Sequence, residues 1–166
     1  MRRIVLFGNA GSGKTTMARE LARKYGLAHL DLDSLAWSRP GVRMLVAESA
    51  DRIREFVDGH PEWVIEGCYG DLLEEALPFA SEVRFLNPGV EQCVVNCQAR
   101  PWEPEKYAAR VEQDRLLGYL LAWVREYETR DDEYSLARHR EIFDRFAGLK
   151  EEIVSLPDRG TDPSRL

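Results

Sequence analysis

The sequence predicts an α/β fold in which a five-stranded parallel sheet is covered by helices on both faces. The chain has 166 residues, of which 44% are hydrophobic, enough for one core in a single domain. Short apolar runs alternate along it with longer segments of helical periodicity. The first apolar run leads directly into a glycine-rich loop and then a helix. Such alternation favours a parallel sheet, because the helices cover its two faces.

The expected strands are short apolar runs, most of them bounded by glycine, proline or acidic residues, as in buried strands of parallel sheets. The first is RIVLF, the third is EWVIE and the last is EIVSL. The five runs span residues 3–7, 28–32, 62–66, 82–86 and 152–156.

The expected helices lie between these strands, where apolar residues recur at helical spacing. A loop with Pro40 and Gly41 precedes the second of them. The segment Arg100–Pro104 contains two prolines, which end a helix there. Gly148 ends the last helix. The helical segments span residues 14–25, 43–58, 71–77 and 89–99, then the stretch from residue 105, and residues 134–146.

The composition excludes several classes of protein. The formal net charge is −6, yet residues 1–30 contain six basic side chains against Glu20 alone, which is +5 and leaves −11 for the rest. An acidic excess argues against a general nucleic-acid binder. No apolar run approaches the roughly 20 residues that span a bilayer. The three cysteines match no zinc-binding pattern. We expect a cytoplasmic protein, monomeric or homodimeric, without nucleic-acid or membrane partners.

Residues 8–15 read GNAGSGKT and match the phosphate-binding pattern G-x-x-x-x-G-K-[ST], the Walker A motif. The glycines permit positive φ, so backbone N–H groups can point at an anion. Lys14 can reach the β- and γ-phosphates, and the Thr15 hydroxyl can bind Mg²⁺. The expected cofactors are therefore ATP and Mg²⁺. The predicted nucleotide-binding residues are Gly8, Asn9, Ala10, Gly11, Ser12, Gly13, Lys14, Thr15 and Thr16.

The motif predicts what is bound but not which reaction follows. The guanine motif N-K-x-D and the transporter signature L-S-G-G-Q are both missing from the sequence. No predicted strand ends in the paired Asp-Glu of mechanical ATPases. A small phosphotransferase that uses ATP and Mg²⁺ to phosphorylate a nucleotide or hydroxylated metabolite is the favoured function. The alternative is a nucleotide-binding regulatory ATPase that hydrolyses ATP slowly and acts on a protein partner.

Residues 3–37 and the segment WVIEGCYG at 63–70 resemble small P-loop kinases of the adenylate/shikimate kinase superfamily. The resemblance is closest to the adenylate kinase-related FlaR-like group, often described as DNA-topology-modulation proteins. It covers residues 1 to about 100, is looser to residue 149, and is absent from the tail. It implies a P-loop NTPase three-layer sandwich with strand order 2-3-1-4-5. It also implies one kinase domain over 1–157, with a helical lid at about 100–133. The last ten residues contain two prolines, a glycine and few apolar groups, so we expect a loose tail at 158–166.

The resemblance also implies an acceptor site. Asp33 would contact the acceptor hydroxyl, although Asp31 or Asp33 could instead merely cap the next helix. Glu66 stands where adenylate kinases have an aspartate near the metal, and Gly67 would allow close approach of the acceptor. Trp37 and Tyr69 would form an acceptor wall, or else belong to the core.

Phosphoryl transfer further needs positive charge over the transferring oxygens. The superfamily places lid arginines where Arg100 stands, and the predicted catalytic residues are thus Lys14, Asp33 and Arg100. Arg110, Arg125 and Arg130 are further candidates, with Arg125 expected to bind substrate. The alternative for each arginine is a solvated position on a helix.

Overall fold

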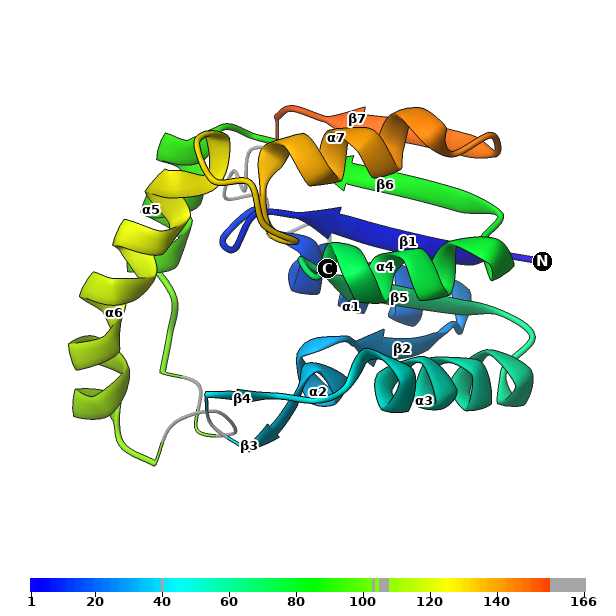
Figure 1. The fold of residues 1–166 in the computed structure, drawn as a ribbon, viewed down its shortest axis with the longest axis horizontal. Coiled ribbons are helices and arrows are strands. Elements are labelled where there is room, and N and C mark those ends of the chain that lie inside the picture. The colour runs from blue at the N-terminus through cyan, green and yellow to red at the C-terminus, as the bar shows by residue number, and fades with distance from the viewer. Residues whose placement is uncertain (40, 103, 105–107, 156–166) are drawn as a thin grey trace.

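The computed structural model describes residues 1–39, 41–102, 104 and 108–155. A five-stranded parallel sheet lies at its centre (Figure 1). Its strands are β1 (Arg3–Gly8), β2 (Ala28–Asp31), β5 (Trp63–Gly67), β6 (Glu82–Leu86) and β7 (Leu149–Ile153). They lie in the order β2-β5-β1-β6-β7. These numbers differ from the expected 2-3-1-4-5 because β3 and β4 form a separate sheet. Counted without them, β5, β6 and β7 are the third, fourth and fifth strands of the main sheet.

Strand β1 occupies the middle of the sheet and is buried on both faces. Val5 and Phe7 pack into one apolar cluster, and Ile4 and Leu6 into another on the opposite face. A strand covered on both sides has no solvent face, which explains its continuous apolar run. Phe7 is the register partner of Gly67 on β5, so β1 and β5 end at the same edge.

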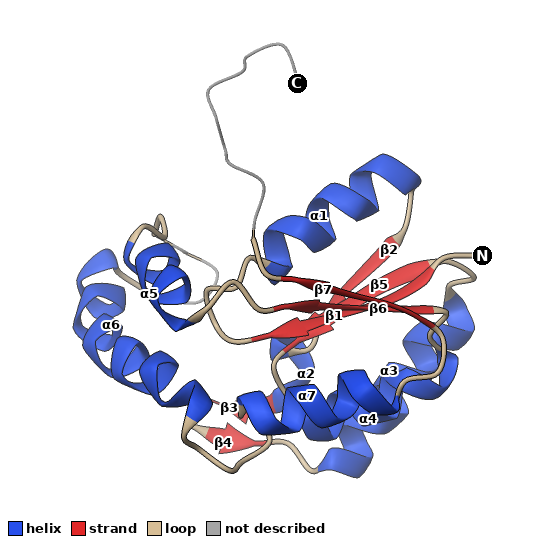
Figure 2. Ribbon diagram, turned by 90° about the horizontal axis from the view of Figure 1, so that it is seen from above, coloured by secondary structure: helices blue, strands red, loops and turns tan. Residues whose placement is uncertain are grey.

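Helices cover the two faces of the sheet unequally (Figure 2). Helix α1 (Lys14–Tyr25) lies on one face. Helices α3 (Val46–Gly59), α4 (Gly70–Ala76) and α7 (Leu136–Arg145) lie on the other. Helices α5 (Val90–Gln98) and α6 (Arg110–Arg125) pack together beside the carboxyl edge of the sheet. The short elements are α2 (Asp33–Ala36), η1 (Leu77–Phe79) and η2 (Glu126–Glu128).

A two-stranded hairpin replaces the loop and helix start that the sequence predicted before residue 46. Strands β3 (Trp37–Arg39) and β4 (Val42–Arg43) pair in antiparallel fashion. Gly41 has φ of +76°, which suits a turn between them. Helix α3 therefore begins at Val46 and not at residue 43, because residues 42 and 43 are committed to the hairpin. Pro40, expected in this loop, lies outside the described residues.

The last strand also differs from its prediction, since β7 spans 149–153 and not 152–156. It lies at the sheet edge and pairs only with β6, with Leu86 opposite Ile153. An edge strand tolerates polar residues, and two 2.7 Å bonds from the Arg140 guanidinium to the Glu152 carboxylate fasten it to α7. Because the strand contains several polar residues, its bounds could not be predicted from an apolar run. The predicted loose tail, 158–166, lies outside the described residues.

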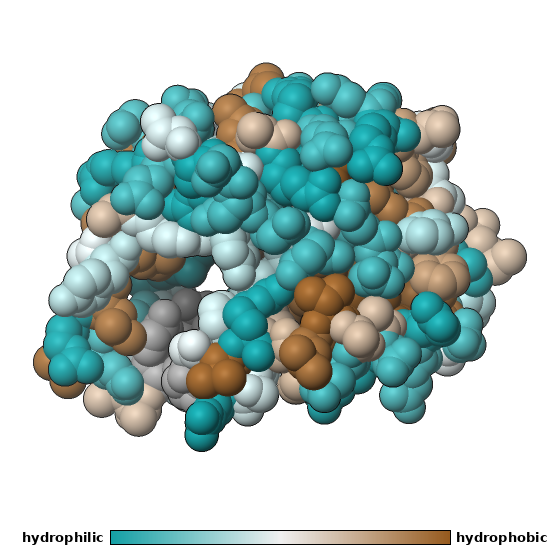
Figure 3. Space-filling view, viewed as in Figure 1, coloured by the Kyte–Doolittle hydropathy of each residue, from teal (hydrophilic) through white to brown (hydrophobic). Residues whose placement is uncertain are grey.

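The segment expected as a helical lid contains α6 and η2. Helix α6 begins at Arg110, five residues later than the pattern suggested; residues 103 and 105–107 lie outside the described part. The space-filling view shows a hollow between α6, at the left, and the body of the molecule (Figure 3). Among the described helices, none is both long and apolar enough to cross a membrane.

Candidate active site

The phosphate loop has the backbone conformation that its glycines permit. Gly8, Gly11 and Gly13 have φ of +147°, +79° and +94°. A Cβ on Gly8 would lie 2.2 Å from the carbonyl oxygen of Leu86, and one on Gly11 would lie 2.3 Å from that of Cys93. Gly8 and Gly11 are therefore required both by backbone conformation and by lack of space.

Lys14 lies folded back over this loop at the start of α1. Its Nζ donates a 2.8 Å hydrogen bond to the Asn9 carbonyl, and the side chain is only 9% exposed. A helix start with a glycine N-cap and no side-chain cap leaves its first N–H groups without intrahelical partners, an arrangement that suits a phosphate.

Two side-chain amides hold the loop in place from the helices beside it. Asn9 Nδ2 donates to the Val124 carbonyl of α6 at 3.0 Å. Asn96 Nδ2, from α5, donates to the Gly11 carbonyl at 2.7 Å. The sequence carries no signal for Asn96, because nothing local indicates that it meets a residue 85 positions away.

A cavity of about 830 Å³ opens at the carboxyl edge of the sheet, within the usual range of about 300–1,000 Å³ for ligand pockets. The phosphate loop and α1 contribute Ala10, Gly11, Gly13, Lys14, Thr15 and Thr16 to its lining. The other predicted nucleotide-binding residues, Gly8, Asn9 and Ser12, are outside this lining, and Asn9 and Ser12 are buried behind it.

Three carboxylates line the same cavity: Asp31, Asp33 and Glu66. Asp31 and Glu66 are register partners at the ends of β2 and β5. Asp31 Oδ1 accepts a 2.9 Å hydrogen bond from the backbone N–H of Asp33, the first residue of α2, whose N-cap residue is Leu32. Glu66 is 2% exposed, and its Oε1 lies 3.5 Å from His29 Nε2.

The oxygen ligands available in the cavity suit Mg²⁺ better than a metal ion that is held by protein ligands alone. The described residues contain no group of three or more His, Cys, Asp or Glu side chains that could hold a metal. Mg²⁺ usually takes only one or two protein ligands and completes its shell with phosphate and water. Within the described part of the chain, Glu66 Oε1 is a buried carboxylate oxygen without a hydrogen-bond donor. Thr15 and Glu66 could therefore hold the ion, as the sequence proposed.

Asp33, Tyr69 and Trp37 are joined in one hydrogen-bonded chain. The Tyr69 hydroxyl donates to Asp33 Oδ1 at 2.6 Å, and Trp37 Nε1 donates to that hydroxyl at 2.9 Å. Burial, and then the nearby Asp33 carboxylate, raise the pKa of Tyr69 well above its ordinary value. Tyr69 thus stays protonated and serves as a fixed donor to Asp33.

Gly67 also lines the cavity, but packing is what requires glycine there. A Cβ at this position would lie 2.9 Å from both Cβ and Cδ1 of Leu32, which is fully buried.

Of the four predicted arginines, the structure places one in the lining of the cavity. Arg100, two residues after the end of α5, lines the cavity together with Arg19, which sequence reasoning did not select. Arg125 instead borders a separate hollow beside Pro88 and Gly89. Arg110 is exposed and lies 3.9 Å from Asp114. Arg130 is nearly buried over the Trp123 ring, outside the lining.

Aromatic residues missed by sequence reasoning complete the lining. Trp102, Trp123 and Tyr134 line the cavity with Trp37 and Tyr69, and only the tertiary fold brings these segments together. Their sequence neighbours carry no motif that marks them.

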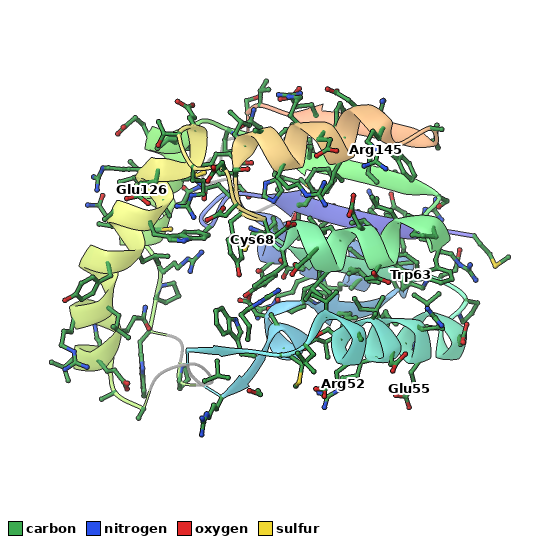
Figure 4. The ribbon with its side chains drawn as sticks, viewed as in Figure 1. Arg52, Glu55, Trp63, Cys68, Glu126 and Arg145 are labelled. Atoms are coloured by element: carbon green, nitrogen blue, oxygen red, sulfur yellow. The ribbon has the colours of Figure 1, made fainter. Side chains whose placement is uncertain are left out.

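A neutral hydrogen-bonded group lies beneath Cys68, which Figure 4 shows near the start of α7. His139 Nε2 donates to the Cys68 carbonyl at 3.0 Å, so its Nδ1 must accept the 2.7 Å bond from the Tyr127 hydroxyl. Burial lowers the pKa of His139 to about 3. Burial raises the pKa of the Cys68 thiol to about 12. Both groups are therefore uncharged at neutral pH.

Comparison with known proteins shows what this chain is similar to in part of its sequence and in its fold. A family model described as "ATPase family associated with various cellular activities (AAA)" matches residues 4–62, less than half of the chain. An unliganded sugar kinase from Janibacter sp. HTCC2649 superposes with a TM-score of 0.51, at 16% identity, over 95% of this chain and 88% of that one. Shikimate kinase from Bacteroides thetaiotaomicron gives 0.55, at 20% identity, over 95% and 90%. The chain has the fold of these kinases. No curated protein matches the sequence.

Proposed function

We propose that the protein is an ATP- and Mg²⁺-dependent kinase that phosphorylates a hydroxyl group of a small molecule. The observation that carries this proposal is that one cavity joins the phosphate loop to Asp33 and Glu66. A phosphate donor and an acceptor hydroxyl could thus occupy the same space. The fold shared with a sugar kinase and a shikimate kinase supports the proposal. Membership of the FlaR-like group is part of the proposal and rests on residues 3–37 and 63–70.

The residues divide the reaction between them. The loop N–H groups and Lys14 hold the β- and γ-phosphates, and Arg100 adds positive charge near the transferring oxygens. Thr15 and Glu66 would hold Mg²⁺, which when bound would neutralise phosphate charge. Asp33 orients the acceptor hydroxyl and takes its proton. The acceptor oxygen forms a bond to the γ-phosphorus, the bond to the β-phosphate oxygen breaks, and ADP leaves.

The regulatory ATPase remains the competing function, and the two differ in their response to an acceptor. The decisive experiment measures ADP release from ATP and Mg²⁺ with and without a panel of nucleosides, nucleotides, sugars and polyol acids. A kinase releases ADP at least ten times faster with one of these acceptors. A rate that no acceptor changes, together with acceleration by a protein partner, would overturn the kinase in favour of the ATPase.

A further inference from the structure

Four aromatic side chains of the cavity form one continuous aromatic wall: Trp37, Tyr69, Tyr134 and Trp123. Neighbouring rings meet edge to face, with centroids 6.4 Å apart for Trp37 and Tyr69 and 5.4 Å apart for the next two pairs. Such geometry is favourable for aromatic pairs. Four different segments contribute these rings, so the wall exists only in the folded protein.

The wall is not simply core. Trp37 remains 39% exposed although its indole N–H is bonded to Tyr69. Trp102, 44% exposed, lines the same cavity from the segment after α5. Large aromatic surfaces left open inside a cavity are typical of ligand pockets, where a bound molecule covers them.

Two arginines support the wall without lining the cavity. The Arg43 guanidinium lies 4.8 Å from the Tyr69 ring centroid and pairs with Asp71 at 2.7 Å. That of Arg130 lies 4.0 Å from the Trp123 centroid and bonds to the Trp123 carbonyl. Two of their nitrogens, Arg43 Nη1 and Arg130 Nε, are buried without a hydrogen-bond partner. Because neither arginine lines the cavity, we assign them to stabilising the rings and not to holding the acceptor.

The cationic and the anionic residues that line the cavity come from different elements of the fold. The described cationic residues of the lining are Lys14 and Arg19 on α1 and Arg100 just after α5. Asn96 of α5 donates a hydrogen bond to the phosphate loop. The three carboxylates stand at or just after the ends of β2 and β5, and Asp33 is bonded to Tyr69 of the wall. A carboxylate or phosphate beside Asp33 would be repelled, whereas hydroxyl groups would find hydrogen-bond acceptors.

We propose that the acceptor is an uncharged alcohol with a flat ring face, as in a nucleoside or a neutral sugar. The ring packs on the aromatic wall, and the hydroxyl meets Asp33. This inference rests on the proposed kinase function and narrows its substrate class. The transfer is the one described above, with the hydroxyl proton passing to Asp33 and ADP leaving.

The test compares matched neutral and acidic acceptors. ADP release is measured with nucleosides against their 5′-monophosphates, and with neutral hexoses against the corresponding sugar acids. We expect kcat/KM at least about tenfold higher for the neutral member of a pair, and the better pair identifies the ring. Preference for the acidic members would overturn the inference while leaving the kinase function standing.

Calorimetry on protein loaded with a non-hydrolysable ATP analogue keeps the two claims separate. If no acceptor is phosphorylated, the kinase function fails. The calorimetric comparison of neutral with acidic compounds then decides the inference by itself. Binding of a neutral ring alcohol, tighter than its acidic partner, supports the wall as a ring site. Binding of neither would overturn it.

Variants of Trp37 test the wall directly. Trp37→Ala should raise KM, or Kd, for the neutral acceptor about tenfold, since stacking on one aromatic ring is worth roughly 5- to 150-fold in affinity. Trp37→Phe keeps a ring and should stay within about threefold. Tyr119→Ala, which removes an aromatic ring 76% exposed on α6 and outside the cavity, is the control. If Trp37→Ala changes KM or Kd less than twofold while circular dichroism is native, the wall does not bind the acceptor.

Discussion

Tyr69 and Asp33, 36 positions apart, are joined by a 2.6 Å hydrogen bond from the phenol to the carboxylate. Asp33 begins the short helix after β2, and Tyr69 immediately precedes the helix after β5. The bond therefore fixes two adjacent strand ends relative to each other. It also fixes the direction in which Asp33 presents its second oxygen.

Tyr69→Phe should slow turnover by about tenfold and leave the Kd for ATP unchanged. The variant keeps the ring and loses both hydrogen bonds of the hydroxyl, so Asp33 is no longer oriented. We expect a stability loss of about 1 kcal/mol, typical of a hydrogen bond. Tyr119→Phe is the control. Steady-state kinetics and ATP titration check this, and an equal loss of ATP affinity would contradict a positioning role.

Asp33→Asn should lower kcat by a factor of about 10² to 10⁴, the usual contribution of general-base catalysis. The amide is similar in shape but cannot take the hydroxyl proton. ATP binding should change little. Asp58→Asn, an exposed change on α3, is the control. Loss of ATP binding to the same extent would instead make Asp33 a metal ligand or a structural cap.

Lys14→Ala should abolish measurable ATP turnover, because it removes the cation facing the β- and γ-phosphates. Since Lys14 is nearly buried and hydrogen-bonded to Asn9, we expect the variant to lower the free energy of unfolding by about 1–2 kcal/mol. Urea denaturation and ADP release measure both effects. Full activity in this variant would rule out the kinase.

Acid should destabilise the protein through His139. Its pKa falls from 6.5 to about 3 on folding, so the unfolded chain binds the proton more readily between these values. Stability should thus rise with pH up to about 6.5, with a contribution of about 1.4 kcal/mol per pH unit. His139→Gln should show a shallower dependence of unfolding free energy on pH between 4 and 6.5. Identical slopes would mean that His139 is not buried in its neutral form.

Gly67→Ala should destabilise the fold by about 1–3 kcal/mol, because the new methyl group overlaps Leu32. Gly59→Ala is a matched control, since nothing lies within 4 Å of a Cβ there. Thermal denaturation of the two variants should differ by several degrees. Equal melting temperatures would show that Leu32 moves aside at little cost.

The elements that the sequence predicted well are those with local signals. The phosphate loop and α1 were predicted because glycine, lysine and helical periodicity lie close together in the chain. The hairpin β3–β4 was missed because strands of three and two residues have no periodicity to detect. The bounds of β7 were wrong because ion pairs, not apolar side chains, hold this edge strand.

The site was predicted in the same uneven way. Asp33 and Tyr69 follow β2 and β5, Glu66 lies near the end of β5, and Trp37 begins β3. All four were found by resemblance, and the cavity does gather them. Tyr134, Trp123 and Asn96 meet it only through contacts between distant segments. Arg125 was misplaced because its position on α6 turns it toward Pro88 and Gly89. That rotation depends on how α6 packs on α5, which no local pattern specifies.

Two hydrogen bonds from side-chain amides couple the positions of α5 and α6 to the conformation of the phosphate loop. Asn96 joins α5 to the loop, Asn9 joins the loop to α6, and Gly11 has no spare room against Cys93. Rotation of either helix would therefore strain these hydrogen bonds. If ATP binds the loop as proposed, a molecule that holds α6 in one position changes ATP affinity by the same factor by which ATP changes that molecule's affinity.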